Sequence, residues 1–262
     1  MSAISAIQAP DFALQGKRAL ITGSTQGLGF AIAQAFAACG AHVTVNGRHH
    51  QRAQATARAI RQAGGAADCW VQDMRDLDAL ESAFTQLCEQ GPAPDILVNN
   101  VGIRQRKALA NTSLAEITDL INVDLIAAVE LSRLAAKAMA DRKGPGRIIT
   151  LTSIAGELAR YGDAIYPVAK QGLSGLIRAL AVEYGPHGIT SNGIAPGTFA
   201  TETNAALAAD PVKGPVVVGR NPLGRWAQPH EITGAAVFLA SPAASYVNGH
   251  IVVVDGGFSI TF

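Results

Sequence analysis

The stretch Thr22-Gly23-Ser24-Thr25-Gln26-Gly27-Leu28-Gly29 decides which fold we expect. It follows a short apolar run at residues 18–22 and precedes a segment of helical periodicity at residues 28–39. Glycines at this spacing allow a tight exit from a strand and a close approach of the backbone to a ligand. Because free N–H groups at a helix N-terminus attract phosphate, the stretch predicts a loop that binds the pyrophosphate of a dinucleotide.

Apolar runs and helical segments continue to alternate along the rest of the chain. This alternation predicts repeated βαβ units, which place helices on both faces of a parallel sheet. The expected strands are residues 18–22, 42–46, 67–72, 96–99, 147–151, 190–194 and 251–254. The expected helices are residues 28–39, 51–62, 77–89, 114–140, 165–184 and 229–239. The predicted fold class is therefore α/β, a doubly wound Rossmann-type fold with a seven-stranded parallel sheet.

One stretch interrupts the alternation. Residues 197–225 mix Thr, Ala, Pro and Gly without a clear period, and a long irregular stretch near a ligand site is typical of a lid. The composition changes sharply nowhere along the 262 residues. We therefore expect a single domain over residues 1–262, with a flexible substrate flap at about 197–225.

The balance of charges and the cysteines exclude several function classes. Lys and Arg number 21 against 20 Asp and Glu, so no large field attracts nucleic acid or anionic lipid. The cysteines Cys39, Cys69 and Cys88 form no C-x-x-C pair, which favours reduced, buried thiols in a cytoplasmic protein. The six histidines show no metal-ligand spacing. We expect a cytoplasmic protein that binds no nucleic acid, membrane or metal.

The end of the second expected strand indicates which nicotinamide cofactor the loop binds. An acidic residue at this place usually accepts hydrogen bonds from the ribose 2′-hydroxyl of NAD. Here the sequence is Asn46-Gly47-Arg48, which has no carboxylate, and a planar guanidinium suits a 2′-phosphate. We therefore expect NADP(H) to be preferred over NAD(H). The alternative is that Arg48 is an ordinary solvated arginine.

Tyr166 and Lys170 are the candidate chemical groups. They stand four residues apart at the start of an expected helix, so both side chains lie on one face and reach a common ligand. An ammonium next to a phenol stabilises the phenolate, which makes Tyr166 a usable acid and base for an alcohol. Ser153 follows the expected strand at residues 147–151 and can supply a hydroxyl to the substrate oxygen.

Pro167 sets a condition on this helix. Proline has no amide hydrogen, so it removes a hydrogen bond inside a helix but fits a first turn. The helix must therefore begin at or just before Tyr166, which places Tyr166 at the helix edge.

Several motifs occur in order along the chain: residues 22–29, Asn99-Asn100-Val101-Gly102, Asn122, Ser153, Tyr166-x-x-x-Lys170 and Pro196-Gly197. In these motifs the chain resembles the short-chain dehydrogenase/reductase family over its whole length. The resemblance implies a NAD(P)-dependent alcohol dehydrogenase or ketone reductase that acts on a small molecule. It further implies that Tyr166 moves the proton at the substrate oxygen, Ser153 polarises that oxygen and Lys170 also binds the nicotinamide ribose.

The resemblance also implies which residues contact the cofactor. Asn122 would hold a water that links Lys170 to solvent as a proton relay. Asp73 would lie near the adenine ring, Asn99 near the adenosine ribose, and Pro196 next to the nicotinamide. The whole implied set is Gly23, Thr25, Gln26, Gly27, Leu28, Gly29, Arg48, Asp73, Met74, Asn99, Val101, Gly102, Tyr166, Lys170, Pro196, Gly197 and Thr198.

Shorter segments resemble one branch of the family, the bacterial gluconate 5-dehydrogenases or 5-keto-gluconate reductases. They are Val45-Asn46-Gly47-Arg48, Glu157-Leu158-Ala159-Arg160, Phe199-Ala200-Thr201-Glu202, Gly224-Arg225-Trp226 and Val247-Asn248-Gly249-His250. The resemblance implies a sugar acid as substrate, and its carboxylate needs a cationic partner. Arg104 and Arg160 are the candidate partners, and Arg106 and Lys107 follow Arg104 closely. Alternatively, these are solvated cations at the rim of the site.

Two other functions are alternatives to an oxidoreductase of sugar acids. A reductase of 3-oxoacyl thioesters would share the fold, the cofactor and the catalytic residues, and would differ mainly in what the flap and the rim accept. A non-catalytic dinucleotide-binding protein would retain the fold without turnover. The presence of Asn122, Ser153, Tyr166 and Lys170 together argues against this second alternative.

The long expected helix at residues 114–140 indicates how copies of the chain assemble. It carries apolar residues over more of its surface than one buried face needs, namely Leu120, Val123, Leu125, Ile126, Val129, Leu131 and Leu134. Leu173, Leu176, Ile177 and Leu180 on the next helix extend this surface. We expect these helices to pair with their copies in a homotetramer, the number of subunits being implied by the family resemblance. Full burial within one chain is the alternative.

Overall fold

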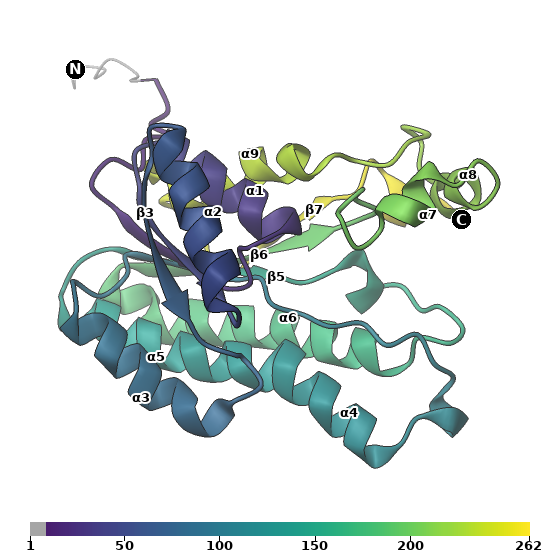
Figure 1. The fold of residues 1–262 in the computed structure, drawn as a ribbon, viewed down its shortest axis with the longest axis horizontal. Coiled ribbons are helices and arrows are strands. Elements are labelled where there is room, and N and C mark those ends of the chain that lie inside the picture. Colours follow the sequence, from purple (N-terminus) through teal and green to yellow (C-terminus); the bar gives the residue numbers. More distant parts are fainter. Residues whose placement is uncertain (1–8) are drawn as a thin grey trace, which may run out of the picture.

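A computed structural model describes residues 9–262 of the chain, and seven parallel strands form its centre (Figure 1). The strands are β1 (Arg18–Ile21), β2 (His42–Gly47), β3 (Ala66–Val71), β4 (Ile96–Asn99), β5 (Gly146–Leu151), β6 (Ile189–Pro196) and β7 (Ile251–Val254). Their order in the sheet is β3-β2-β1-β4-β5-β6-β7, and every neighbouring pair runs parallel. The predicted doubly wound α/β fold is therefore confirmed.

Helices cover both faces of the sheet (Figure 1). One face carries α1 (Gly27–Ala38), α2 (His50–Gln62) and α9 (Thr233–Ala240), and the other carries α3 (Leu77–Glu89), α4 (Leu114–Ile121), α5 (Ala127–Asp141) and α6 (Ile165–Tyr184). Successive strand residues point to opposite faces, so Leu20 and Ile21 of β1 enter different cores. Ile21 packs in the cluster that contains Phe36 of α1, and Leu20 packs in the cluster that contains Met139 of α5. The burial of both faces explains why the strands are continuously apolar.

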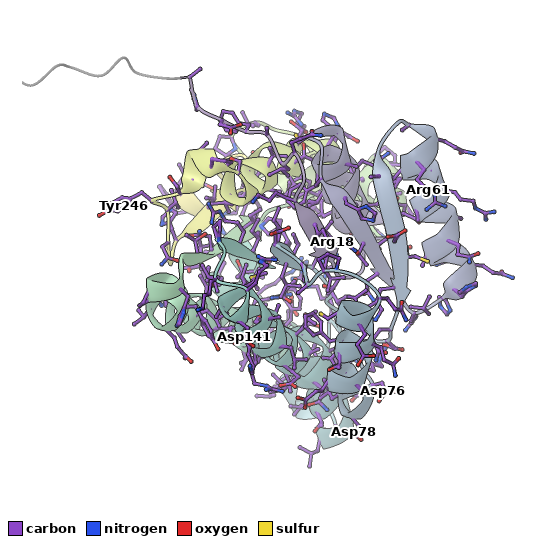
Figure 2. The ribbon with its side chains drawn as sticks, turned by 90° about the vertical axis from the view of Figure 1, so that its left-hand side faces the viewer. Arg18, Arg61, Asp76, Asp78, Asp141 and Tyr246 are labelled. Carbon is purple, nitrogen blue, oxygen red and sulfur yellow. The ribbon has the colours of Figure 1, made fainter. Side chains whose placement is uncertain are left out.

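Local sequence signals fix where the helices begin and end. Gly40 and Gly64 follow the ends of α1 and α2 with φ values of 93° and 89°, a left-handed conformation that favours glycine. The Asp76 side chain accepts a hydrogen bond from the amide of Ala79 at the start of α3, where Figure 2 shows Asp76 and Asp78 close together at the surface. These ends set the directions in which the loops leave the sheet.

The structure differs from the expected elements in three places. The expected helix at 114–140 is divided by a π turn at Asn122–Ile126 between α4 and α5. The expected helix at 229–239 begins with a 3₁₀ turn at Pro229–Ile232. The flap contains two short helices, α7 (Ala205–Ala209) and α8 (Lys213–Val218), which are too short to produce a periodic pattern. Other 3₁₀ turns are Leu109–Asn111, Ile154–Gly156, Gly185–His187, Pro242–Ala244 and Phe258–Ile260.

Most apolar side chains of the long helices are buried within the chain. Of the residues expected to face another copy, Ile126 and Val129 are the large ones that stay exposed, at 40% and 37%. The buried members are Leu120, Val123, Leu131, Leu134, Leu173, Ile177 and Leu180. Burial within one chain therefore accounts for most of this set. Among residues 9–262, no helix has both the length and the apolar character needed to cross a membrane.

The sheet order places a crevice where the function is expected. β1 lies between β2 and β4, so the chain turns to opposite sides of β1 when it continues to these two neighbours. Ligands of open α/β sheets bind at such a switch point, beyond the carboxyl ends of the strands. The glycine-rich stretch and the loop after β4 both leave the sheet at this edge.

Candidate active site

Buried hydrogen bonds fix the glycine-rich loop to the neighbouring strands. The Asn46 side chain at the end of β2 accepts from the amide of Gly23 at 3.0 Å and donates to the carbonyl of Trp70 on β3 at 3.2 Å. The Ser24 hydroxyl donates to the carbonyl of Ile21 at 2.7 Å. Gly23 and Gly27 have φ values of 60° and 59°, which side chains rarely tolerate. The loop is therefore held in shape by the protein itself.

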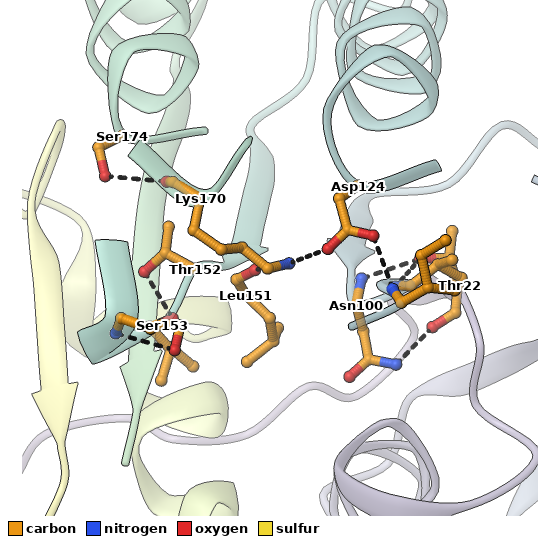
Figure 3. Close-up of polar contacts among 12 residues, drawn as sticks. Thr22, Asn100, Asp124, Leu151, Thr152, Ser153, Lys170 and Ser174 are labelled. Atoms are coloured by element: carbon orange, nitrogen blue, oxygen red, sulfur yellow. Dashed lines mark hydrogen bonds and ion pairs between the residues drawn. The ribbon is translucent and has the colours of Figure 1, made fainter. Parts of the chain in front are cut away.

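Gly29 allows the start of α1 to approach the loop after β4. A Cβ atom on Gly29 would lie 2.5 Å from Nδ2 of Asn100 and 2.7 Å from the carbonyl oxygen of Gly23. Such distances are too short for non-bonded atoms, so only glycine fits here. The Asn100 amide in turn donates to the carbonyl of Thr22 at 2.9 Å (Figure 3).

A cavity of about 420 Å³ begins at this loop and follows the ends of β1, β2 and β4. Its volume lies in the usual range of roughly 300–1,000 Å³ for cofactor sites. The residues that line it include ten of the predicted cofactor contacts: Gly23, Thr25, Gln26, Gly27, Leu28, Arg48, Asp73, Met74, Val101 and Gly102. The structure thus gathers most of the predicted set around one cavity.

A carboxylate of the flap, that of Glu202, is bound by the glycine-rich loop, which shows that the loop can hold an anion. Oε2 of Glu202 accepts a hydrogen bond from the amide of Gly27 at 2.9 Å, at the N-terminus of α1. Helix N-termini attract negative charge because their first amides are free and the helix dipole is positive there. The carboxylate oxygen stands in for a phosphate oxygen, so the loop fits the pyrophosphate of a dinucleotide.

The far end of the cavity is basic. Arg48 is exposed beyond β2 and lines the cavity, as does Arg52 in the first turn of α2. Neither guanidinium forms an ion pair with another residue in the part of the chain that the structure describes. Asp73 and Met74 complete this end. An uncompensated arginine at this place fits a 2′-phosphate.

The Asn99 side chain lies inside the fold, and its implied place near the adenosine ribose stays a prediction. Its side chain is buried and donates to the hydroxyls of Ser132 at 2.8 Å and Thr150 at 3.3 Å, which turns it away from the cavity. The next residue, Asn100, lines the cavity instead. Asn100, the first residue after β4, is thus the asparagine whose side chain borders the cavity.

Tyr166 and Lys170 lie together at the start of α6. This helix begins at Ile165, so Pro167 stands in its first turn and the condition that it imposes is met. Nζ of Lys170 lies 5.3 Å from the centre of the Tyr166 ring, and Lys170 is 97% buried, with 3% of its surface exposed. The Ser153 hydroxyl accepts from the amide of Ala155 at 3.1 Å, which leaves its hydrogen available to a substrate oxygen (Figure 3).

Asp124, which the sequence analysis did not single out, is the polar neighbour of Lys170. Its carboxylate lies 3.3 Å from Nζ of Lys170 (Figure 3). No hydrogen bond joins Asn122 to Lys170 within residues 9–262, and the Asn122 carbonyl accepts from the amide of Ala127 across the π turn. The implied link from Asn122 through a water stays a prediction.

The predicted rim cations differ in their partners. Arg104 forms an ion pair with the buried carboxylate of Asp163, and its guanidinium carbon lies 4.7 Å from the centre of the Tyr166 ring. Lys107 pairs with Glu116 at 2.9 Å. No ion pair involves Arg106 or Arg160 in the described range 9–262. Burial and the nearby charges of Arg104 and Arg160 lower the pKa of Arg106, so cations crowd this side of the site.

The family of the chain follows from its similarity to known proteins. The model of a family described as Enoyl-(Acyl carrier protein) reductase matches residues 23–259. The chain belongs to the short-chain dehydrogenase/reductase family. This short-chain dehydrogenase/reductase is 38% identical to the gluconate 5-dehydrogenase of Gluconobacter oxydans over 254 residues, which are 96% of this chain and 98% of the relative.

Two further relatives are a solved structure and a reductase of another substrate class. A gluconate 5-dehydrogenase from Burkholderia cenocepacia, solved in complex with NADP and tartrate, has a TM-score of 0.91 at 37% identity and covers 96% of this chain and 98% of its own. The 3-oxoacyl-[acyl-carrier-protein] reductase of Aquifex aeolicus is 33% identical over 93% of this chain and 98% of the relative. The chain is thus an oxidoreductase of this family.

The remaining cofactor predictions concern the end of β6 in this short-chain dehydrogenase/reductase. Pro196 ends β6, and Gly197 follows so close to Asp255 that a Cβ atom would lie 2.6 Å from the Asp255 Cβ. Thr198 lines a separate cavity of about 140 Å³. None of these three residues lines the larger cavity, so their contacts with nicotinamide stay predictions.

Proposed function

We propose that the chain is an NADP(H)-dependent oxidoreductase that interconverts a secondary alcohol and a ketone on a sugar acid such as gluconate and 5-keto-gluconate. The observation that carries the proposal is an excess of positive charge next to Tyr166. Asp163 is the buried acid at this place and is already paired with Arg104. Arg106 and Arg160 stay without an ion-pair partner in the described residues, so the site lacks an anion that a substrate carboxylate would supply.

The catalytic residues suit the proposed reaction. In the reductive direction, the Tyr166 phenol donates a proton to the carbonyl oxygen, and the Ser153 hydroxyl donates a hydrogen bond to the same oxygen. The buried ammonium of Lys170 favours the phenolate that this transfer leaves on Tyr166. When bound, the nicotinamide cofactor supplies or accepts the hydride at the substrate carbon.

Two observations support NADP(H) and a sugar acid. The cavity ends at Arg48, which has no carboxylate partner in the part of the chain that the structure describes. The relatives include a gluconate 5-dehydrogenase from Gluconobacter oxydans and one from Burkholderia cenocepacia in complex with NADP and tartrate. Tartrate, like gluconate, carries hydroxyl groups next to a carboxylate, so this complex supports a sugar acid as the substrate class.

Steady-state kinetics of two alanine variants test this proposal. We expect Arg106→Ala and Arg160→Ala to raise the KM for 5-keto-gluconate by at least about tenfold, because a charge-assisted hydrogen bond is worth roughly 1.5–3 kcal/mol. The KM for a neutral ketone should stay nearly constant, since that substrate offers no carboxylate. NADPH oxidation followed by absorbance measures both values.

Lys107→Ala is the matched control, because Lys107 lies in the same loop but is already paired with Glu116. Equal effects of the arginine variants on the neutral ketone and on the sugar acid would contradict the carboxylate site. Turnover of 3-oxoacyl thioesters but not of sugar acids would favour the runner-up function, which the similarity to the Aquifex aeolicus reductase supports.

We also propose that the enzyme works as a homotetramer in the cytoplasm. The exposed Ile126 and Val129 on the long helix segment support contact with another copy, although they form a small apolar surface. Free thiols at Cys39, Cys69 and Cys88 suit a reducing compartment. Light scattering at working concentration tests the assembly, and a monomer would contradict it.

A further inference from the structure

A second cavity, of about 500 Å³, lies toward the amino ends of β1, β2 and β3, whereas the cofactor cavity lies beyond their carboxyl ends. We call it the amino-end cavity. It is bordered by α2 and by the C-terminal end of α3, and Arg18 and Arg61, both labelled in Figure 2, line it. Within the described residues, none lines both cavities. Its volume is in the range of roughly 300–1,000 Å³ that small-molecule sites usually have.

The amino-end cavity carries an excess of positive charge. The guanidinium groups of Arg18, Arg58 and Arg61 line it, and among the described residues Asp68 supplies the one carboxylate. That carboxylate is already paired with His42 at 2.6 Å. Three cations therefore face a single anion that has another partner.

The chain itself supplies no further counter-ion to these arginines. None of the three forms an ion pair within residues 9–262. The sequence of residues 1–8 contains no Asp or Glu. An anion that neutralises the cavity must therefore come from another molecule.

Arg18 is the arginine that most needs a partner. It is half-buried at the start of β1, and its guanidinium forms no hydrogen bond in the part of the chain that the structure describes. It lies against the end of α3, because a Cβ atom on Gly91 would be 3.1 Å from Nη2 of Arg18. Polar groups removed from water are normally hydrogen-bonded, since an unpaired charge is costly there. A half-buried guanidinium without a partner, on the wall of a cavity, indicates a place for an anion.

Thr44 gives independent evidence of a missing ligand. It exposes 6% of its surface and lines the cavity, yet its hydroxyl forms no hydrogen bond with any described residue. Thr44 is the register partner of Leu20, which stands two residues after Arg18, so the Arg18 and Thr44 side chains lie on the same face of the sheet. The hydroxyl and the guanidinium can thus donate to one ligand.

The end of a helix accounts for only one of the three arginines. Arg61 lies in the last turn of α2, where a cation offsets the helix dipole, and its Nη1 donates to the carbonyl of Ala67 at 2.6 Å. Arg58 stands three residues earlier on the same face of α2, and its side chain forms no hydrogen bond within residues 9–262. Arg18 and Arg58 are therefore free to contact one anion from the sheet and from the helix.

We propose that the amino-end cavity is a second anion site, which binds a phosphate group of a small molecule. Planar guanidinium groups suit phosphate, because one arginine can donate two parallel hydrogen bonds to two of its oxygens. The amides of Gln54 and Gln90 and the hydroxyl of Thr44 add neutral partners for the rest of a phosphate ester. The site is independent of the proposed substrate, because it shares no described residue with the cofactor cavity.

Isothermal titration calorimetry of inorganic pyrophosphate into the NADP-saturated protein tests this proposal. NADP fills the glycine-rich loop, where pyrophosphate would otherwise bind as well. A measured stoichiometry of one NADP per chain establishes first that NADP leaves the second cavity free. We expect one pyrophosphate per chain and a higher Tm, because a ligand of the native state stabilises it. Glucose 6-phosphate is titrated in the same way, and the tighter ligand identifies whether the site prefers a free phosphate or a phosphate ester.

Three variants locate the binding. Arg18→Gln and Arg58→Gln should each weaken pyrophosphate binding by at least about tenfold, because each removes charge-assisted hydrogen bonds. Thr44→Val keeps the shape and removes one neutral hydrogen bond, so a loss of about two- to tenfold is expected. Arg178→Gln is the matched control, since it makes the same change of net charge at an exposed arginine of α6 that lines neither cavity.

The absence of pyrophosphate binding at millimolar concentrations would overturn the proposal. An equal loss in Arg178→Gln would also overturn it, because the binding would then follow the overall charge and not the cavity. Circular dichroism checks that each variant folds. If Arg18→Gln does not fold, Arg58→Gln still decides the question, because Arg58 is exposed on the helix surface and its replacement leaves the core unchanged.

Discussion

The two ends of the site are built differently. At the cofactor end, the glycine-rich loop is held by hydrogen bonds from Asn46 and Ser24, and its shape follows from residues near each strand end. At the substrate rim, Arg104 depends on Asp163, which lies 59 residues away in the sequence. The cofactor end is therefore rigid and locally encoded, whereas the rim depends on long-range charge pairs that substitution can rearrange.

The largest expected effect tests the rigidity of the cofactor end. In Gly29→Ala the new methyl group meets the Asn100 side chain and the Gly23 carbonyl, so the loop and α1 must separate. We expect the free energy of unfolding to fall by about 1–3 kcal/mol, the usual cost of overpacking. NADPH binding should weaken by at least about tenfold, which corresponds to 1.4 kcal/mol. Urea denaturation and NADPH fluorescence measure the two quantities.

Gly175→Ala is the matched control for this variant. Gly175 lies in α6 with nothing within 4 Å of its would-be Cβ atom and has a helical backbone. Alanine there should stabilise the fold by about 0.5–1 kcal/mol, because it reduces the entropy of the unfolded chain. Unchanged NADPH affinity in Gly29→Ala would show that the loop adapts, and the contrast between the two ends would be wrong.

The same contrast separates what the sequence could and could not predict. Strands β4 and β7 and helix α6 have the predicted bounds, because their apolar periodicity is local. Tyr166 and Lys170 were brought together as expected, since four residues make one helical turn. Periodicity likewise placed the glycine-rich loop between β1 and α1.

Other features depend on geometry that no local pattern contains. The partnership of Glu202 with Gly27 spans 175 residues, and it exists only because the flap folds back over the loop. Which asparagine side chain borders the cavity, that of Asn100 and not that of Asn99, depends on where β4 ends. Asp124 reaches Lys170 through a π turn, which inserts one residue into a sequence that reads as one continuous helix. A sequence signal was available only for Asp124, as an acidic residue between the apolar Val123 and Leu125.

An intermediate effect is expected at the basic end of the cavity. Arg48→Ala should weaken NADPH binding by at least about tenfold and leave NADH binding nearly unchanged, because only NADPH presents a 2′-phosphate to the guanidinium. Fluorescence titrations with both cofactors measure the ratio. Arg52→Ala is the comparison variant, since Arg52 lines the same end of the cavity. A larger loss in Arg52→Ala would place the 2′-phosphate next to the first turn of α2 and not next to Arg48.

The smallest expected effect lies where the two ends meet. Glu202 of the flap bonds the Gly27 amide, which a bound pyrophosphate would also require, so the carboxylate must leave when the cofactor binds. Glu202→Gln keeps the length of the side chain and removes its charge. Since a charge at an exposed helix N-terminus contributes roughly 0.3–1 kcal/mol, we expect NADPH to bind about two- to fivefold more tightly.

Glu89→Gln makes the same change of net charge at an exposed position on α3 that does not line the cavity, so it should leave the affinity unchanged. An equal gain in both variants would assign the effect to net charge. Weaker binding in Glu202→Gln would instead mean that Glu202 holds the flap over the bound cofactor. In that case the flap would be part of the cofactor end, and the boundary between a locally encoded end and a long-range rim would have to be drawn beyond residue 202.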